Sequence, residues 1–127
     1  MRTLGLDYGR SKVGVALGTG TFAEPMEVIR YSDTNILEKR IEKLIKEEKI
    51  DKVVVGISEG VMEIESKEFA EAIQPFIHSK IEFYDETLTS KDAQRLSQEA
   101  GIKQKKRHQM EDAYAAAIML QNYLDNS

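Results

Sequence analysis

The stretch from Leu4 to Leu17, LGLDYGRSKVGVAL, decides the fold. It predicts an apolar strand that ends at Asp7, a turn at Gly9, and a second strand over 13–17 that runs back beside the first. A carboxylate at the tip of a buried strand is costly to desolvate unless it binds a metal ion, hydrogen-bond donors or a substrate. A plain turn is the alternative, because residues 7–11 are all ordinary turn formers.

The composition is that of an ordinary globular domain. With 127 residues, 41% of them apolar and 31% charged, the chain is predicted to form one domain over residues 1–127. The absence of cysteine excludes a disulfide framework, a thiolate metal site and a cysteine nucleophile. No stretch has the length of a membrane span or the pattern of a signal peptide, so we expect a cytoplasmic protein that does not bind membranes.

The net charge of −4 argues against a protein that coats nucleic acid through bulk positive charge. It does not exclude a metal-dependent nuclease. The active site of such an enzyme is itself acidic, and its divalent cations supply the positive charge that meets the phosphate.

Strand and helix periodicities alternate after the opening hairpin. Strands are predicted over residues 27–31, 52–56 and 81–84. Helices are predicted over residues 35–48, 69–77, 90–100 and 110–124. Their connections are a turn at 18–21, a loop at 58–65 and a basic connector at 103–108. This order, β-β-β-α-β-α-β-α-α, predicts an α/β fold with a mixed five-stranded sheet and helices on both faces.

Local signals predict where these elements begin and end. Asn35, with Glu38 three residues later, is the expected N-cap and capping box of the first helix. Ser66 is the expected cap of the second helix, and Pro75 is expected to distort its last turn. Pro25 is expected at the entry of the third strand.

Three acids stand out by their positions in these elements. Asp7 ends the first strand, Glu86 follows the last strand, and Asp112 opens the final helix. Ligands of open α/β sheets collect at the carboxyl ends of the strands, where these acids are expected to meet. Carboxylates gathered at one place repel one another unless a hard cation lies between them, and Mg²⁺ fits such oxygen ligands best.

Four motifs, in order, resemble the YqgF/RuvX-like family of the ribonuclease H-like superfamily. They are the opening motif Gly5 to Ala16, the central strand Val54 to Ile57, the segment Asp85 to Ser90 followed by Ala93, and the helix motif Asp112 to Ala116 leading into Leu120 to Leu124. The third is similar to the family's Asp-Glu-Arg-Leu-Thr-Thr motif. The match covers essentially the whole chain.

The resemblance implies a ribonuclease H-like nuclease domain whose metal-binding and catalytic acids are Asp7, Glu86 and Asp112. We expect two ions, Mg²⁺ or Mn²⁺, with Asp7 bridging both and the other two acids each fixing one. Members of the family are described as nucleases that process pre-16S rRNA and as Holliday junction resolvases. The expected substrate is therefore structured RNA, at the 5′ end of pre-16S rRNA, or branched DNA.

Two departures from the family pattern affect substrate handling. Thr87 stands where the family has arginine, so one expected contact to phosphate or to a neighbouring acid is missing. The loop over residues 56–63 lacks the family's proline and its Asn-Met-Asp-Gly sequence, and it carries extra negative charge.

Five basic residues are candidate phosphate contacts: Arg10, Lys12, Lys105, Lys106 and Arg107. The alternative is that they are solvated residues of a turn and a connector. A neighbouring aromatic residue, Tyr8, is expected either to stack on a base or to pack on the sheet.

Two other functions are consistent with parts of the sequence. Sugar kinases and actin-like ATPases open with a similar Asp-x-Gly hairpin, but they close two lobes around a nucleotide and this chain has the length of one. A catalytically silent nucleic-acid adaptor would retain the fold without turnover. A junction resolvase needs two sites and hence a homodimer, whereas RNA trimming is possible for a monomer.

Overall fold

The computed structural model describes the backbone of residues 1–57, 61–85 and 104–126, and the side chains of 1–57, 63–85 and 110–126. The elements are β1 (Arg2–Tyr8), β2 (Lys12–Thr19), β3 (Phe22–Arg30), α1 (Thr34–Glu47), β4 (Lys52–Ile57), α2 (Val61–Ile73), the 3-10 helix η1 (Gln74–Phe76), β5 (Lys80–Asp85) and α4 (Gln104–Asp125). No helix in these ranges is long and apolar enough to span a membrane. The helix expected over 90–100 lies outside the described residues.

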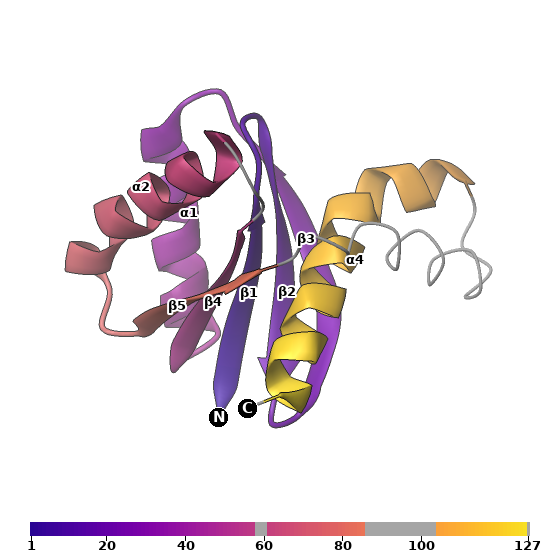
Figure 1. The fold of residues 1–127 in the computed structure, drawn as a ribbon. Coiled ribbons are helices and arrows are strands. Elements are labelled where there is room, and N and C mark those ends of the chain that lie inside the picture. Colours follow the sequence, from indigo (N-terminus) through magenta and orange to yellow (C-terminus); the bar gives the residue numbers. More distant parts are fainter. Residues whose placement is uncertain (58–60, 86–103, 127) are drawn as a thin grey trace.

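The five strands form one mixed sheet in the order β3-β2-β1-β4-β5. The first three strands are antiparallel neighbours, and β4 lies parallel to both β1 and β5. Helices α1 and α2 cover one face of the sheet, and α4 covers the other (Figure 1). The predicted α/β architecture with helices on both faces is therefore confirmed.

The alternation of side chains along β1 divides its residues between the two faces. Leu4 and Leu6 are fully buried in one hydrophobic cluster with Leu37 and Ile41 of α1 and Phe69 of α2. The intervening residues of β1 face α4. Under α4 the strands contribute small residues, in contrast to the leucines that they contribute under α1 and α2.

Glycine and alanine bring α4 close to the sheet. A Cβ atom on Gly5 would lie 3.0 Å from the Cβ of Leu120, and Ala16 is buried together with Ala116 and Ala117 of the helix. Small residues on both sides of an interface let a helix backbone approach the strands more closely than a layer of leucines would. This close approach determines where the polar residues of α4 lie.

Several predicted boundaries were wrong for local reasons. Helix α1 is capped by Asp33, whose extended backbone allows its carboxylate to accept a hydrogen bond from the backbone N–H of Asn35 at 2.8 Å. Helix α2 begins at Val61, so residues 61–65 are helical and not part of a loop. Ser66 is a buried residue within this helix, 2% exposed, and does not cap it.

The proline residues have the positions that their missing N–H allows. Pro75 ends α2 in the 3-10 turn η1, as expected. Strand β3 begins at Phe22, earlier than predicted, with Pro25 inside it. Because β3 is an edge strand and its pairing with β2 is irregular between Val15 and Ala16, a proline is tolerated there.

Candidate active site

Asp7 lies near the carboxyl end of β1, on the face covered by α4. Asp7 and Gly5 are two residues apart in β1 and therefore lie on the same face of the sheet. At Gly5 the absence of a side chain leaves room for Leu120 of α4. In the antiparallel pairing of β1 with β2, Asp7 is directly opposite Gly14. Side chains of such a pair point to the same face, with Cβ atoms about 5 Å apart.

The backbone of Asp112 lies directly over Gly14. A Cβ atom on Gly14 would be 1.9 Å from the carbonyl oxygen of Asp112 and 3.0 Å from the backbone nitrogen of Ala113. Because Gly14 is the cross-strand partner of Asp7, this contact places Asp112 beside Asp7 on the same face of the sheet. The backbones of two of the three predicted acids, 105 positions apart in sequence, thus approach the same point of the sheet.

Lys12 adds a positive charge to this pair. Its Nζ lies 3.0 Å from Oδ2 of Asp112, and the side chains of Lys12 and Asp112 are 41% and 27% exposed. Lys12 begins β2, two residues before Gly14, so it points to the same face. An ion pair this exposed contributes roughly 0–1 kcal/mol to stability.

Asp112 lies well inside α4, in contrast to its predicted place in the first turn. The helix begins at Gln104, so Lys105, Lys106 and Arg107 belong to its N-terminal turns and not to a connector. At 1.5 Å per residue they lie roughly 8–10 Å from Asp112 along the helix axis. Their side chains lie outside the described part of the structure.

The far end of α4 is anchored to the β2–β3 turn by Gln121. The side-chain amide of Gln121 donates to the carbonyl oxygen of Thr21 at 2.7 Å and accepts from the backbone N–H of Ala23 at 2.9 Å. A helix fixed at this point and seated on Gly14 has little freedom to rotate. The position of Asp112 therefore depends on contacts along the whole helix.

A second anchor joins α4 to β4 and β5. The Tyr123 hydroxyl accepts a hydrogen bond from Lys52 at 3.0 Å and donates one to Glu82. The hydrogen bond from Tyr123, with Lys52 and Lys80 nearby, holds the pKa of Glu82 below its usual value. The same hydroxyl and the Glu82 carboxylate raise the pKa of Lys52. Both groups are therefore charged at neutral pH.

A row of paired residues extends from Asp7 across the sheet to β5, the last strand before Glu86 in the sequence. Asp7 pairs with Gly56 of β4, and Gly56 pairs with Tyr84 of β5. Glu86 follows Tyr84 by two positions and, like Thr87, lies outside the described residues. In the described ranges, no three His, Asp or Glu side chains are gathered closely enough to hold a metal ion.

The chemistry of the donor set fits a hard divalent cation. Asp7 and Asp112 supply carboxylate oxygens, which are the ligands that Mg²⁺ and Mn²⁺ prefer. The side chains of Lys12 and Asp112 are partly exposed, so solvent reaches this point, and Mg²⁺ characteristically retains several of its waters.

Arg10 and Tyr8 lie on the other face of the sheet from Asp7. The guanidinium of Arg10 contacts both carboxylate oxygens of Glu65 in α2, each at 3.2 Å. Tyr8 stacks on Phe69 with ring centroids 4.9 Å apart, so it packs on the sheet. A hollow of about 430 Å³ lies here, and burial raises the pKa of Tyr31, which lines it.

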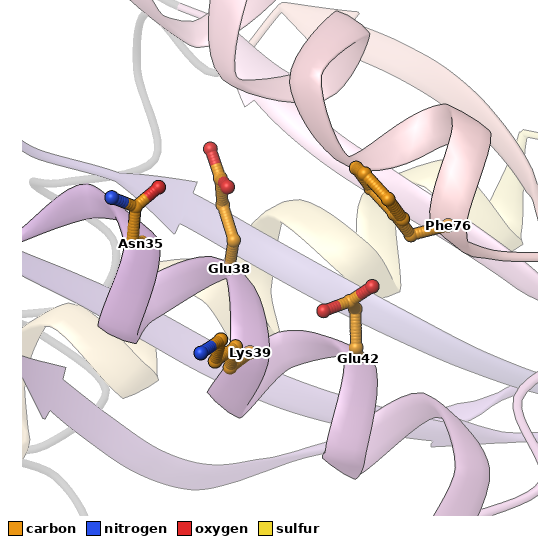
Figure 2. Close-up of a pocket in the computed structure, with 5 residues that line it drawn as sticks. All are labelled: Asn35, Glu38, Lys39, Glu42 and Phe76. Atoms are coloured by element: carbon orange, nitrogen blue, oxygen red, sulfur yellow. The ribbon is translucent and has the colours of Figure 1, made fainter.

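A further hollow, of about 400 Å³, lies beside α1 on the same side of the sheet. Figure 2 shows Phe76 of η1 across from Glu38 and Glu42, with Asn35 and Lys39 completing the lining. This hollow is on the face opposite Asp7 and Asp112. Its acidic lining is unsuited to phosphate.

The sequence interpretation missed Gly14. A glycine within an apolar strand is a known signal of a bulge or of a close backbone approach. The alanines at 113, 116 and 117 are the matching signal on the helix. Read together, they would have predicted that α4 crosses β2 at this point.

Comparison with solved structures shows the fold class. The chain is similar to *Thermus thermophilus* RuvC in complex with a Holliday junction substrate, with a TM-score of 0.66 over 99% of this chain and 94% of that one, at 16% identity. The protein thus has the ribonuclease H-like fold of the RuvC-like resolvases.

Sequence comparison gives the family. The chain matches the RuvX family, described as Holliday junction resolvase, over residues 1–126. A *Leuconostoc citreum* protein named "Putative pre-16S rRNA nuclease" is 38% identical over 98% of this chain and 95% of its own length. A *Syntrophomonas wolfei* protein of the same name is 33% identical over 98% and 94%. The chain belongs to the RuvX family, and it is a nuclease.

Proposed function

We propose that this nuclease hydrolyses phosphodiester bonds with the help of two divalent ions, Mg²⁺ or Mn²⁺, held by Asp7, Glu86 and Asp112. The observation that carries the proposal is the seating of Asp112 over Gly14, the cross-strand partner of Asp7. Two neighbouring carboxylates repel each other, so a helix that only covered the sheet would gain no stability from an acid near the one at the end of a buried strand.

The chain's own residues supply ligands and orientation. When bound, the ions polarise the phosphate, lower the pKa of water and stabilise the leaving oxygen. Asp7 is held by a central strand and Asp112 by a helix anchored at Gln121, so neither position depends on a loop. Glu86, directly after β5, is the proposed third ligand.

The proposed substrate is the 5′ end of pre-16S rRNA, which the enzyme would process in the cytoplasm. The names of relatives that are 33–38% identical over nearly the whole chain support this choice. The second candidate is four-way DNA cleaved by a homodimer, which the description of the family favours.

The proposed phosphate contacts are Lys12, Arg10 and the three basic residues at the start of α4, Lys105, Lys106 and Arg107. Lys12 lies at the acid pair itself. The helical residues share α4 with Asp112, at about the distance of one or two nucleotides along the axis. Arg10 would have to leave Glu65 to reach the substrate.

The deciding experiment compares cleavage of an rRNA precursor and of a four-way DNA junction, with and without Mn²⁺, by the parent protein and by Asp7→Asn. We expect Mn²⁺-dependent cleavage of the rRNA precursor that Asp7→Asn abolishes while its melting temperature stays close to that of the parent. The mass in solution, measured in parallel, distinguishes a monomer from the dimer that junction resolution requires.

Other outcomes would redirect the proposal. Unchanged cleavage by Asp7→Asn would overturn the mechanism. Cleavage of the junction alone, by a dimer, would establish the second candidate. Binding without any cleavage by the parent would show a catalytically silent adaptor, and tight ATP binding would point to the kinase-like alternative.

A further inference from the structure

Arg10 in the β1–β2 turn and Lys12 at the start of β2 are directed to opposite faces of the sheet. Lys12 contacts Asp112 at 3.0 Å on the α4 face, while Arg10 contacts Glu65 on the α2 face. Of the two, only Lys12 therefore lies beside the carboxylates at the end of β1. Its Nζ takes one of the contacts that Oδ2 of Asp112 could make to a metal ion.

We propose that Lys12 is an internal counter-ion of Asp112, that it competes with the divalent metal for this carboxylate, and that the displaced ammonium then binds the substrate phosphate. This inference rests on the proposed function of Asp112 as a metal ligand. It assigns one lysine to two successive partners, the acid before metal binding and the phosphate after it.

Electrostatics favours this exchange. Asp7 and Asp112 approach the same point of the sheet at Gly14, where their negative charges would repel each other, and the ammonium of Lys12 on Asp112 reduces that repulsion. A bound divalent ion performs the same task with twice the charge. It then repels the ammonium from the carboxylate.

The side chain of Lys12 is suited to moving between partners. It is 41% exposed, so its flexible four-carbon stem can turn outward without opening the core. Its ammonium binds a phosphate as a point charge and needs no fixed geometry. The pair with Asp112, partly exposed itself, is weak enough to be broken by a metal ion.

The first test measures Mn²⁺ binding by isothermal titration calorimetry, without nucleic acid, in the parent, Lys12→Met and Arg10→Met. Loss of the competing ion pair predicts that Lys12→Met binds Mn²⁺ about three- to fivefold more tightly than the parent. Arg10→Met removes the same charge from the same hairpin but faces α2, so its affinity should equal that of the parent. Melting temperatures confirm that both variants fold.

The second test measures binding of a non-hydrolysable oligonucleotide by fluorescence anisotropy. In the presence of Mn²⁺, Lys12→Met should bind it several-fold more weakly than the parent, because the freed ammonium is missing. Without metal, the two proteins should bind equally, since Asp112 retains the ammonium in the parent.

The failures of the two ideas are distinguishable. If the parent binds Mn²⁺ and Lys12→Met binds it no more tightly, or if Arg10→Met gains as much, the exchange is wrong and the metal site stands. An oligonucleotide defect of Lys12→Met that is equal with and without Mn²⁺ also overturns the exchange. If the parent binds no Mn²⁺ at all, the proposed metal site falls and the exchange falls with it.

Discussion

The carbonyl oxygen of Asp112 lies 1.9 Å from the point where a Cβ atom of Gly14 would be. No other residue type fits at position 14 without moving the backbone of α4. Since Gly14 is opposite Asp7, this contact determines how closely the backbone of Asp112 approaches the strand beside Asp7. The strand glycine thus acts as a positioning residue of the candidate site.

We expect Gly14→Ala to destabilise the protein by about 3 kcal/mol, near the upper end for overpacked cores, because the new methyl meets a backbone atom. Gly18→Ala is the matched control on the same strand and face. Its Cβ would lie 3.2–3.3 Å from side-chain carbons of Leu120 and Leu124, which can rotate away, and 3.3 Å from the Cβ of Thr3, which needs to shift by only a few tenths of an ångström. Urea unfolding should show a cost for Gly18→Ala under about 1 kcal/mol; equal costs would contradict the close approach at Gly14.

Asp112→Asn should lower metal-dependent cleavage at least about 100-fold, because an amide replaces a proposed anionic ligand. Its stability should change by less than about 1 kcal/mol, since the ion pair with Lys12 is partly exposed. Asp125→Asn, at the far end of the same helix, should leave the cleavage rate unchanged. Single-turnover rates with saturating metal make the comparison, and a rate for Asp112→Asn near that of the parent would remove Asp112 from the site.

Replacing each of two phenylalanines on the α1–α2 side by alanine should change the stability by very different amounts. Phe69 is 5% exposed and stacks on Tyr8, so Phe69→Ala should cost about 3–4 kcal/mol. Phe76, lining the hollow of Figure 2, is 66% exposed, and Phe76→Ala should change stability by less than about 0.5 kcal/mol. Chemical denaturation measures both, and a large cost at Phe76 would show that this side chain is buried in solution.

Glu82 should make the anchor of α4 sensitive to acid. Its pKa is lowered in the folded protein by Tyr123 and the two lysines, so it contributes stability above its unfolded pKa and loses it as the pH falls through the folded pKa. Glu82→Gln should therefore be about 1 kcal/mol less stable than the parent at pH 7, and this difference should shrink as the pH is lowered to about 3.

The control for the pH series is Glu24→Gln, an exposed residue of β3. Its stability relative to the parent should be the same at both pH values. Urea titrations monitored by circular dichroism supply the free energies. If Glu82→Gln remains as much less stable than the parent at about pH 3 as at pH 7, the anchor is stabilised by the geometry of its hydrogen bonds and not by the charge of Glu82.

The fold class was predictable because it depends on local periodicity. The apolar runs of β1, β2 and β4 and the helical spacing in α1 appear directly in the sequence, and the motif order pointed to the family. Element ends were less predictable. Asp33 and Asn35 are equally good N-caps by type, and only the backbone conformation at Asp33 selects it.

The amino-acid types already identify the residues with the chemistry for the site: the acids Asp7 and Asp112 and the cations Arg10 and Lys12. Which of them meet follows only from the packing of the folded chain. The turn between β1 and β2 directs Arg10 to Glu65, strand alternation in β2 directs Lys12 to Asp112, and the missing side chain of Gly14 lets the backbone of Asp112 approach the strand beside Asp7. Such sorting depends on register and on helix approach, which are properties of the packed chain and not of any one segment.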